Sequence, residues 1–94
     1  MIKTEKLALL KHNLQLTTNA NDTLLDFLLD SADERIQREG ITADDSIEYT
    51  SIQIDYAAWL FRKRAAQEGD TAMPRFLRWA MNNLLMAQKA GGTS

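Results

Sequence analysis

The chain has 94 residues, a length that predicts a single domain. Hydrophobic residues make up 45% of it and charged residues 26%, as in ordinary globular proteins, and no apolar run approaches the roughly 18 residues of a membrane span. The lack of cysteine excludes disulfides, thiolate catalysis and cysteine-based metal sites, and the net charge of −2 disfavours a high-affinity DNA binder.

The charge is distributed unevenly along the sequence. Residues 1–55 hold five Lys/Arg and eleven Asp/Glu, a net charge of −6. Residues 56–94 hold six Lys/Arg and two Asp/Glu, a net charge of +4. The chain is therefore electrically polarised, and the folded surface is polarised too if these side chains are exposed.

The first predicted helix covers residues 5–13, with Thr4 as its N-cap. Leu7, Leu10 and Leu14 mark its apolar side. Turn-forming and capping residues in LQLTTNAND then interrupt the helical pattern.

The second predicted helix covers residues 21–39. Gly40 suits the left-handed position that follows a helix, and Ile41 can supply the accompanying apolar contact. At about 100° per residue, one face is apolar and carries Leu25, Leu28, Leu29, Ala32 and Ile36. The other side carries an acidic stripe, formed by Asp22, Asp26, Asp30 and Asp33. Such a stripe is either simply solvated or meets a basic surface on another subunit.

Residues 41–50 are predicted to form a loop, which carries Asp44, Asp45 and Glu48. The third helix is expected to cover residues 51–67 and to end before Gly69. The adjacent Asp44 and Asp45 could assist a divalent ion, but they define no metal site.

The third helix contains YAAWLFRKR, in which aromatic side chains stand beside three consecutive cations. Aromatic and basic residues together can indicate a nucleic-acid surface. On a helix, however, Arg62, Lys63 and Arg64 fan around the axis and cannot form one patch. Apolar residues lie on two opposite faces, with Trp59 on one and Phe61 on the other. This pattern predicts a helix sandwiched inside the domain with both aromatics largely buried, so that Phe61→Ala costs about 3–5 kcal/mol of stability.

The fourth helix is predicted over residues 74–89, because Pro74 suits the first helical position. Thr71 is an alternative cap slightly upstream, and Gly91 and Gly92 end the helix. Its predicted core face carries Phe76, Leu77, Ala80, Leu84 and Ala87. The chain is therefore expected to form an all-α bundle of about four helices over residues 1–90, with a flexible tail at 91–94.

A basic stripe is predicted on the far side of the fourth helix, formed by Arg75, Arg78, Asn82 and Lys89. Trp79 and Met86 flank this stripe. An exposed Trp and Met beside cations are typical of a contact surface. The alternative is a solvated basic face with Trp79 tucked under a neighbouring segment.

Little in the sequence supports catalysis. His12 is the only histidine, and the phosphate-binding, nucleophile-elbow and zinc-protease motifs do not occur. The carboxylates do not match the spacing of a calcium loop either. We therefore expect no enzyme activity, no cofactor and no metal site.

Three segments together resemble the head–tail connector (adaptor, or head-completion) proteins of tailed bacteriophages and prophages. They are LQLTTNANDTLLDFLLDSADERIQREGI, IDYAAWLFRKRAAQEG and MPRFLRWAMNNLLM, and with the preceding helix they cover about residues 3–88. The resemblance implies a structural virion protein that forms a ring under the portal protein. It also implies that the ring extends the DNA channel and provides the docking platform for stopper or tail-completion proteins.

The resemblance further implies a location at the head–tail junction of the virion, and in the host cytoplasm during assembly. DNA would pass through the channel without sequence-specific binding. Isolated subunits are expected to be monomers or weak oligomers. The ring contact is expected to join the acidic stripe to Arg75, Arg78 and Lys89 of a neighbour, with Trp79 as the apolar anchor and Met86 beside it. The alternatives are a small helical DNA-binding module for phage packaging or regulation and a helical interaction domain of another kind.

The expected lack of a metal site can be tested directly. Protein washed with chelator should carry no stoichiometric zinc or calcium in elemental analysis, because the sequence offers neither cysteine nor a second histidine. A metal bound at one equivalent per chain would overturn this expectation.

Overall fold

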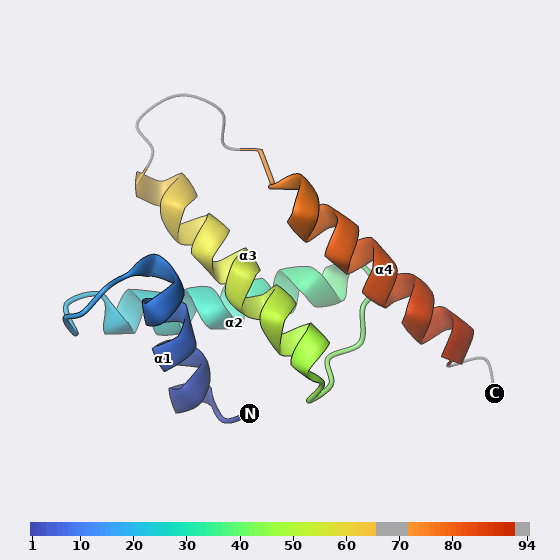
Figure 1. Cartoon of the computed structure of the whole chain (residues 1–94), viewed down its shortest axis with the longest axis horizontal. Coiled ribbons are helices and arrows are strands. Elements are labelled where there is room, and N and C mark those ends of the chain that lie inside the picture. Colours follow the sequence, from blue (N-terminus) through green and yellow to red (C-terminus); the bar gives the residue numbers. More distant parts are fainter. Residues whose placement is uncertain (66–71, 92–94) are drawn as a thin grey trace.

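The computed structural model describes residues 1–65 and 72–91, and these ranges contain four α-helices and no strand (Figure 1). The helices are α1 (Lys3–Leu14), α2 (Asp22–Arg38), α3 (Ile47–Ala65) and α4 (Arg75–Gly91). The predicted all-α fold with four helices is therefore confirmed. The expected helix stops at Gly69 and Gly92 and the alternative cap Thr71 lie outside the described residues.

The helix α3 is the centre of the packing. It contacts α1, α2 and α4, and Figure 1 shows it crossing α2, with α1 at one side and α4 at the other. The molecule measures 46 × 32 × 18 Å, and its shortest dimension is about the thickness of two helices. Such a flat arrangement leaves a large part of each outer helix without a neighbour among the described residues.

None of the helices in the described ranges is long and apolar enough to cross a membrane.

The two-sided burial predicted for α3 is present. Ile52 and Tyr56 on one face are buried, and so are Ile54 and Ala58 on nearly the opposite face. Trp59 and Phe61, however, are only half-buried, so the expectation that they are largely buried was wrong. They lie near the C-terminal end of α3, where they pack against the edge of the buried core.

The helix α2 follows its predicted pattern closely. All five residues of the apolar face are buried, and Ile41 is also buried after the turn. Gly40 has a φ of +96°, the left-handed conformation that favours glycine. A regular amphipathic period and a glycine stop thus placed this helix correctly.

The helix α1 begins two residues earlier than predicted, so Thr4 is helical and is not the N-cap. The Glu5 side chain accepts a hydrogen bond from the Ile2 N–H at 3.1 Å, which satisfies a backbone donor before the first turn. Leu10 is buried, and Leu7 and Leu14 pack partly against the core. The chain leaves α1 at Gln15, which has a φ of 59°.

The helix α3 begins at Ile47, so residues 47–50 are helical and the prediction of a loop there was wrong. The hydroxyl of Ser46 accepts a hydrogen bond from the Tyr49 N–H at 3.0 Å, as an N-cap side chain does. The Asp44 carboxylate in turn accepts bonds from the Ser46 N–H at 3.0 Å and from the Ser46 hydroxyl at 2.6 Å. These bonds lower the pKa of Asp44, the Ser46 hydroxyl being the largest cause.

A stability comparison tests how α3 is covered. Leu29 is fully buried, so Leu29→Ala should lower the free energy of unfolding by about 2–5 kcal/mol. Phe61 is half-buried, so Phe61→Ala should cost only about 1–2 kcal/mol, less than a core phenylalanine. Urea unfolding followed by circular dichroism measures both values. An equal or larger loss for Phe61→Ala would show that the end of α3 is more deeply buried than described.

A second comparison concerns Tyr49, which is buried and whose hydroxyl donates a hydrogen bond to the Asp33 carboxylate. Tyr49→Phe removes this bond to a charged acceptor and should cost about 1.5–3 kcal/mol near pH 7. Burial and then the Asp33 bond raise the pKa of Tyr49 above its ordinary value of about 10. Above pH 10 the unfolded chain loses this proton while the folded chain keeps it, so the stability contributed by Tyr49 falls as the pH rises.

Unfolding of the parent and of Tyr49→Phe should therefore be compared between pH 8 and 11. The stability advantage of the parent should shrink above pH 10, and a constant or growing advantage would contradict the assigned bond.

Candidate interaction surface

The helix α4 is held to the domain by one narrow side. Leu77, Met81 and Leu84 are buried there. The Gln88 side chain pairs with the backbone of Thr42, accepting its N–H at 2.7 Å and donating to its C=O at 2.8 Å. At the start of the helix, the Pro74 carbonyl accepts hydrogen bonds from the Leu77 N–H at 3.1 Å and from the Arg78 N–H at 3.2 Å. Pro74 therefore precedes the helix and is not its first residue.

The predicted core face of α4 was only partly right. Leu77 and Leu84 are buried and Ala80 is half-buried, but Phe76 and Ala87 are exposed. Met81, which the sequence pattern did not single out, is buried in their place. The reason is that α4 carries two apolar stripes, and periodicity alone does not say which of them faces the core.

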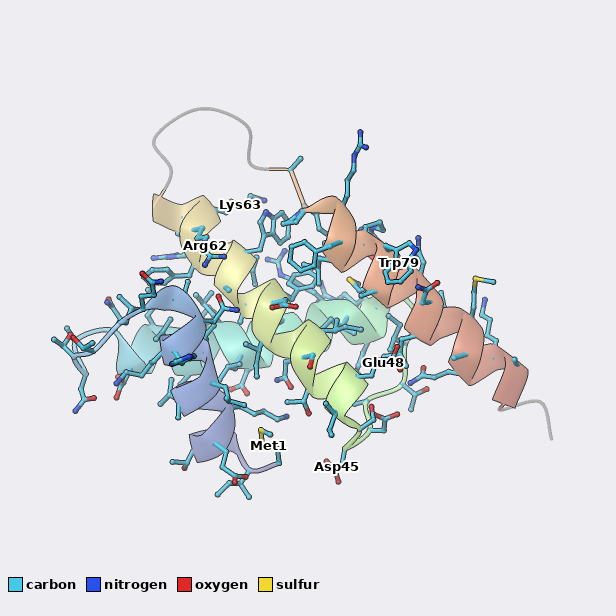
Figure 2. The ribbon with its side chains drawn as sticks, in the orientation of Figure 1. Met1, Asp45, Glu48, Arg62, Lys63 and Trp79 are labelled. Carbon is cyan, nitrogen blue, oxygen red and sulfur yellow. The ribbon has the colours of Figure 1, made fainter. Side chains whose placement is uncertain are left out.

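The second apolar stripe faces solvent. We call it the α4 outer stripe and define it as Phe76, Trp79 and Met86, whose exposed fractions are 61%, 69% and 68%. Trp79 is labelled on α4 in Figure 2. The prediction that Trp79 and Met86 are poorly covered is confirmed. Large apolar side chains gathered on one exposed helix face are typical of a binding surface.

Basic residues border this stripe. Arg75 and Lys89 are exposed and form no ion pair with any described residue. Arg78 is exposed but lies 3.1 Å from the Glu39 carboxylate, so part of its charge is used inside the chain. Asn82 is exposed as well. The predicted basic stripe thus exists, and it is attached to the end of α2 through Arg78.

The acidic stripe of α2 already has partners within the chain. Lys3 lies 2.6 Å from Asp30 and 3.4 Å from Asp26, and Lys11 lies 3.0 Å from Asp22. The hydrogen bond to Asp30 is the largest cause of a raised pKa at Lys3.

The Asp33 carboxylate accepts a hydrogen bond from the Tyr49 hydroxyl. All four carboxylates therefore help to hold α1 and α3 on α2, a role that the sequence did not reveal. The structure does not bring the acidic stripe and the basic stripe of one chain together.

The residues with catalytic or metal-binding potential are few among those described. They contain no group of three or more His, Cys, Asp or Glu side chains that could hold a metal ion. His12 is exposed near the end of α1. Burial raises the pKa of Asp55, against the opposing effects of Arg62 and Asn13. What this arrangement provides is apolar contact area bordered by charge, which is chemistry of binding.

Comparison with protein-family models, curated proteins and solved structures found no match for this chain.

Proposed function

We propose that this protein is a head–tail connector of a tailed bacteriophage or prophage, a structural virion protein that assembles as a ring under the portal. The resemblance of the sequence to that family supplies the phage context. The observation that carries an assembly role is the α4 outer stripe, three large apolar side chains exposed on one helix face. A protein that worked alone would gain nothing from leaving this surface uncovered.

The outer stripe is suited to a contact anchored by Trp79. Buried aromatic side chains usually supply most of the free energy of a protein interface. Arg75 and Lys89 lie at the border of the stripe, where ion pairs contribute only about 0–1 kcal/mol each and mainly set the orientation. A partner surface with an apolar pocket and acidic borders would fit this face of α4.

The acidic stripe remains a candidate for the opposing surface, because the side chains of Asp26 and Asp30 are 48% and 66% exposed despite their pairing with Lys3. A neighbour's cation would have to share these carboxylates with Lys3. Asp22 and Asp33 are less accessible and are more firmly committed to the fold.

The second candidate function is the helical DNA-binding module. The observation in its favour is that Arg62, Lys63 and Arg64 are all exposed at one end of α3. Because they fan around the helix, they could contact phosphates but could not read bases from one face. The overall net charge of −2 also opposes non-specific binding to DNA.

The connector proposal predicts that Trp79→Ala weakens assembly on the portal protein by about tenfold or more, as expected for an interface hot spot. Leu9→Ala is a matched control, because Leu9 is an exposed apolar residue on α1, far from α4 in the sequence. The measurement is the occupancy of portal rings in negative-stain micrographs and in pull-down titrations. Asp26→Lys, tested beside them, reports on the acidic stripe, with circular dichroism confirming that each variant folds.

If Trp79→Ala and Asp26→Lys both assemble as well as the parent does, these surfaces are not the contact. If the parent itself binds no portal but binds duplex DNA with an affinity that falls steeply with salt, the connector proposal is replaced by the DNA-binding one.

A further inference from the structure

The two ends of α3 carry opposite charge, and charged side chains are exposed at both. At the N-terminal end lies what we call the acidic end, formed by Asp45, Ile47 and Glu48. Ile47 is 83% exposed, the highest value among the large apolar residues described. Asp45 and Glu48 are exposed beside it and make no hydrogen bond or ion pair with the described residues. Ile47 therefore gains little from packing within its own chain, and acids without an ion-pair partner stand close to it in the sequence.

At the other end of α3 lies a groove between α2 and α3, with a volume of about 390 Å³. Its floor is apolar and consists of Leu28, Leu60 and Phe27, the last of which is 64% exposed. Arg35, Lys63 and Arg64 line its rim, and the lining residues within the described ranges include no carboxylate. We call this the basic groove. Figure 2 shows Lys63 at one end of α3 and Glu48 and Asp45 at the other.

The charges of the basic groove are available to a partner. Arg64 makes no ion pair with the described residues, and Arg35 bonds only to the neutral hydroxyl of Ser31, at 3.3 Å. The Lys63 ammonium lies 5.0 Å from the centre of the Trp59 ring and is exposed on its other sides. An apolar floor with a cationic rim suits an apolar side chain flanked by carboxylates.

The acidic end has that chemistry, and it cannot reach the groove of its own chain. The two surfaces are about 25 Å apart along α3, given a rise of about 1.5 Å per residue. The four aspartates of α2 are already paired with α1 and Tyr49, and Glu34 pairs with Arg38 of its own helix. Within the described ranges, the acidic end is a place where exposed apolar surface and acids without an ion-pair partner coincide.

We infer that the acidic end of one copy docks into the basic groove of a second copy. Ile47 would pack on Phe27 and Leu60, and Asp45 and Glu48 would face Arg35, Lys63 and Arg64. Because two different surfaces meet, the contact is heterologous, and repeating it generates a closed ring or an open filament. A ring built this way does not use a contact between the α4 outer stripe and the acidic stripe of a neighbour, so the α4 outer stripe is left for the portal protein.

This inference deepens the proposed function by naming the surfaces through which subunits meet. It rests on the proposed function in one respect, because ring assembly is the reason for taking a second copy of the chain as the occupant of the groove.

The chain lacks cysteine, so single cysteines can report the contact without interference. Ile47→Cys and Phe27→Cys both replace exposed side chains, and neither should disturb the fold. At high protein concentration under mild oxidation, a mixture of the two variants should form disulfide-linked dimers. Each variant alone should not, because a heterologous contact brings different surfaces together. A mixture of Phe27→Cys with Leu9→Cys is the matched control for random collision.

Charge exchange tests the same contact in a second way. In the cysteine mixture, Glu48→Lys placed on the Ile47→Cys chain should lower the linked fraction about tenfold. Arg64→Glu placed on the Phe27→Cys chain should restore it. The inference is overturned if the mixture links no better than the control, if Ile47→Cys links mainly with itself, or if the exchanged pair does not recover.

The outcome can be separated from that of the connector proposal. Specific linking in a protein that binds no portal would refute the connector role and leave the contact standing. Full assembly on the portal without specific linking would refute the contact between the acidic end and the basic groove and leave the connector role standing.

Discussion

The fold depends on covering α3 on two sides. Ile52 and Tyr56 point to one side of this helix and Ile54 and Ala58 to nearly the other, and all four are buried. A helix that is apolar on opposite faces needs neighbours on both. The chain meets this requirement with three other helices, and the result is a body 18 Å thick in which α4 contacts mainly α3. The outer side of α4 then contacts no other described helix, and Phe76, Trp79 and Met86 on it are exposed.

Ion pairs and hydrogen bonds hold α1 in place, because the small core buries little of this helix. Only Leu10 of α1 is buried, and the helix is joined to α2 by Lys3 and Lys11. Lys6 donates to the Gln53 side chain at 2.8 Å, and Gln53 donates to the Leu29 carbonyl of α2 at 3.0 Å, so one buried amide connects three helices. Exposed ion pairs contribute little each, about 0–1 kcal/mol, so their main effect is to fix how α1 lies on α2. The acidic stripe is thus first of all a structural feature.

The sequence predicted an element well where its local pattern of apolar and capping residues was clear, and poorly where the packing of other elements decided its structure. The regular apolar period of α2 and the stop at Gly40 predicted its core face completely. The start of α3 was missed because Ser46, its cap, lies within an acidic segment that has the composition of a loop. On α4 the burial of Met81 in place of Phe76 depends on how the helix is rotated against α3, and its own two apolar stripes do not specify that rotation. The partners of the acidic stripe depend on where α1 docks, and no local pattern contains that information.

An exposed carboxylate indicates a contact surface only where no cation of the same chain pairs with it. Asp26 and Asp30 are exposed, but Lys3 satisfies them, and their position on α2 is explained by the fold alone. Asp45 and Glu48 have no such partner among the described residues, and Ile47, which lies between them in the sequence, is open to water. Favourable placement in the helix dipole accounts for an acid near the N-terminus of α3, worth about 0.3–1 kcal/mol, and for cations near its C-terminus. It does not account for Ile47 or for Phe27, each of which keeps a large apolar side chain in solvent next to charges that could orient a second chain. Exposed apolar side chains stand beside unpaired charge of opposite sign near the two ends of α3, Ile47 at one end and Phe27 of α2 at the other, and this coincidence is the basis for the proposed contact.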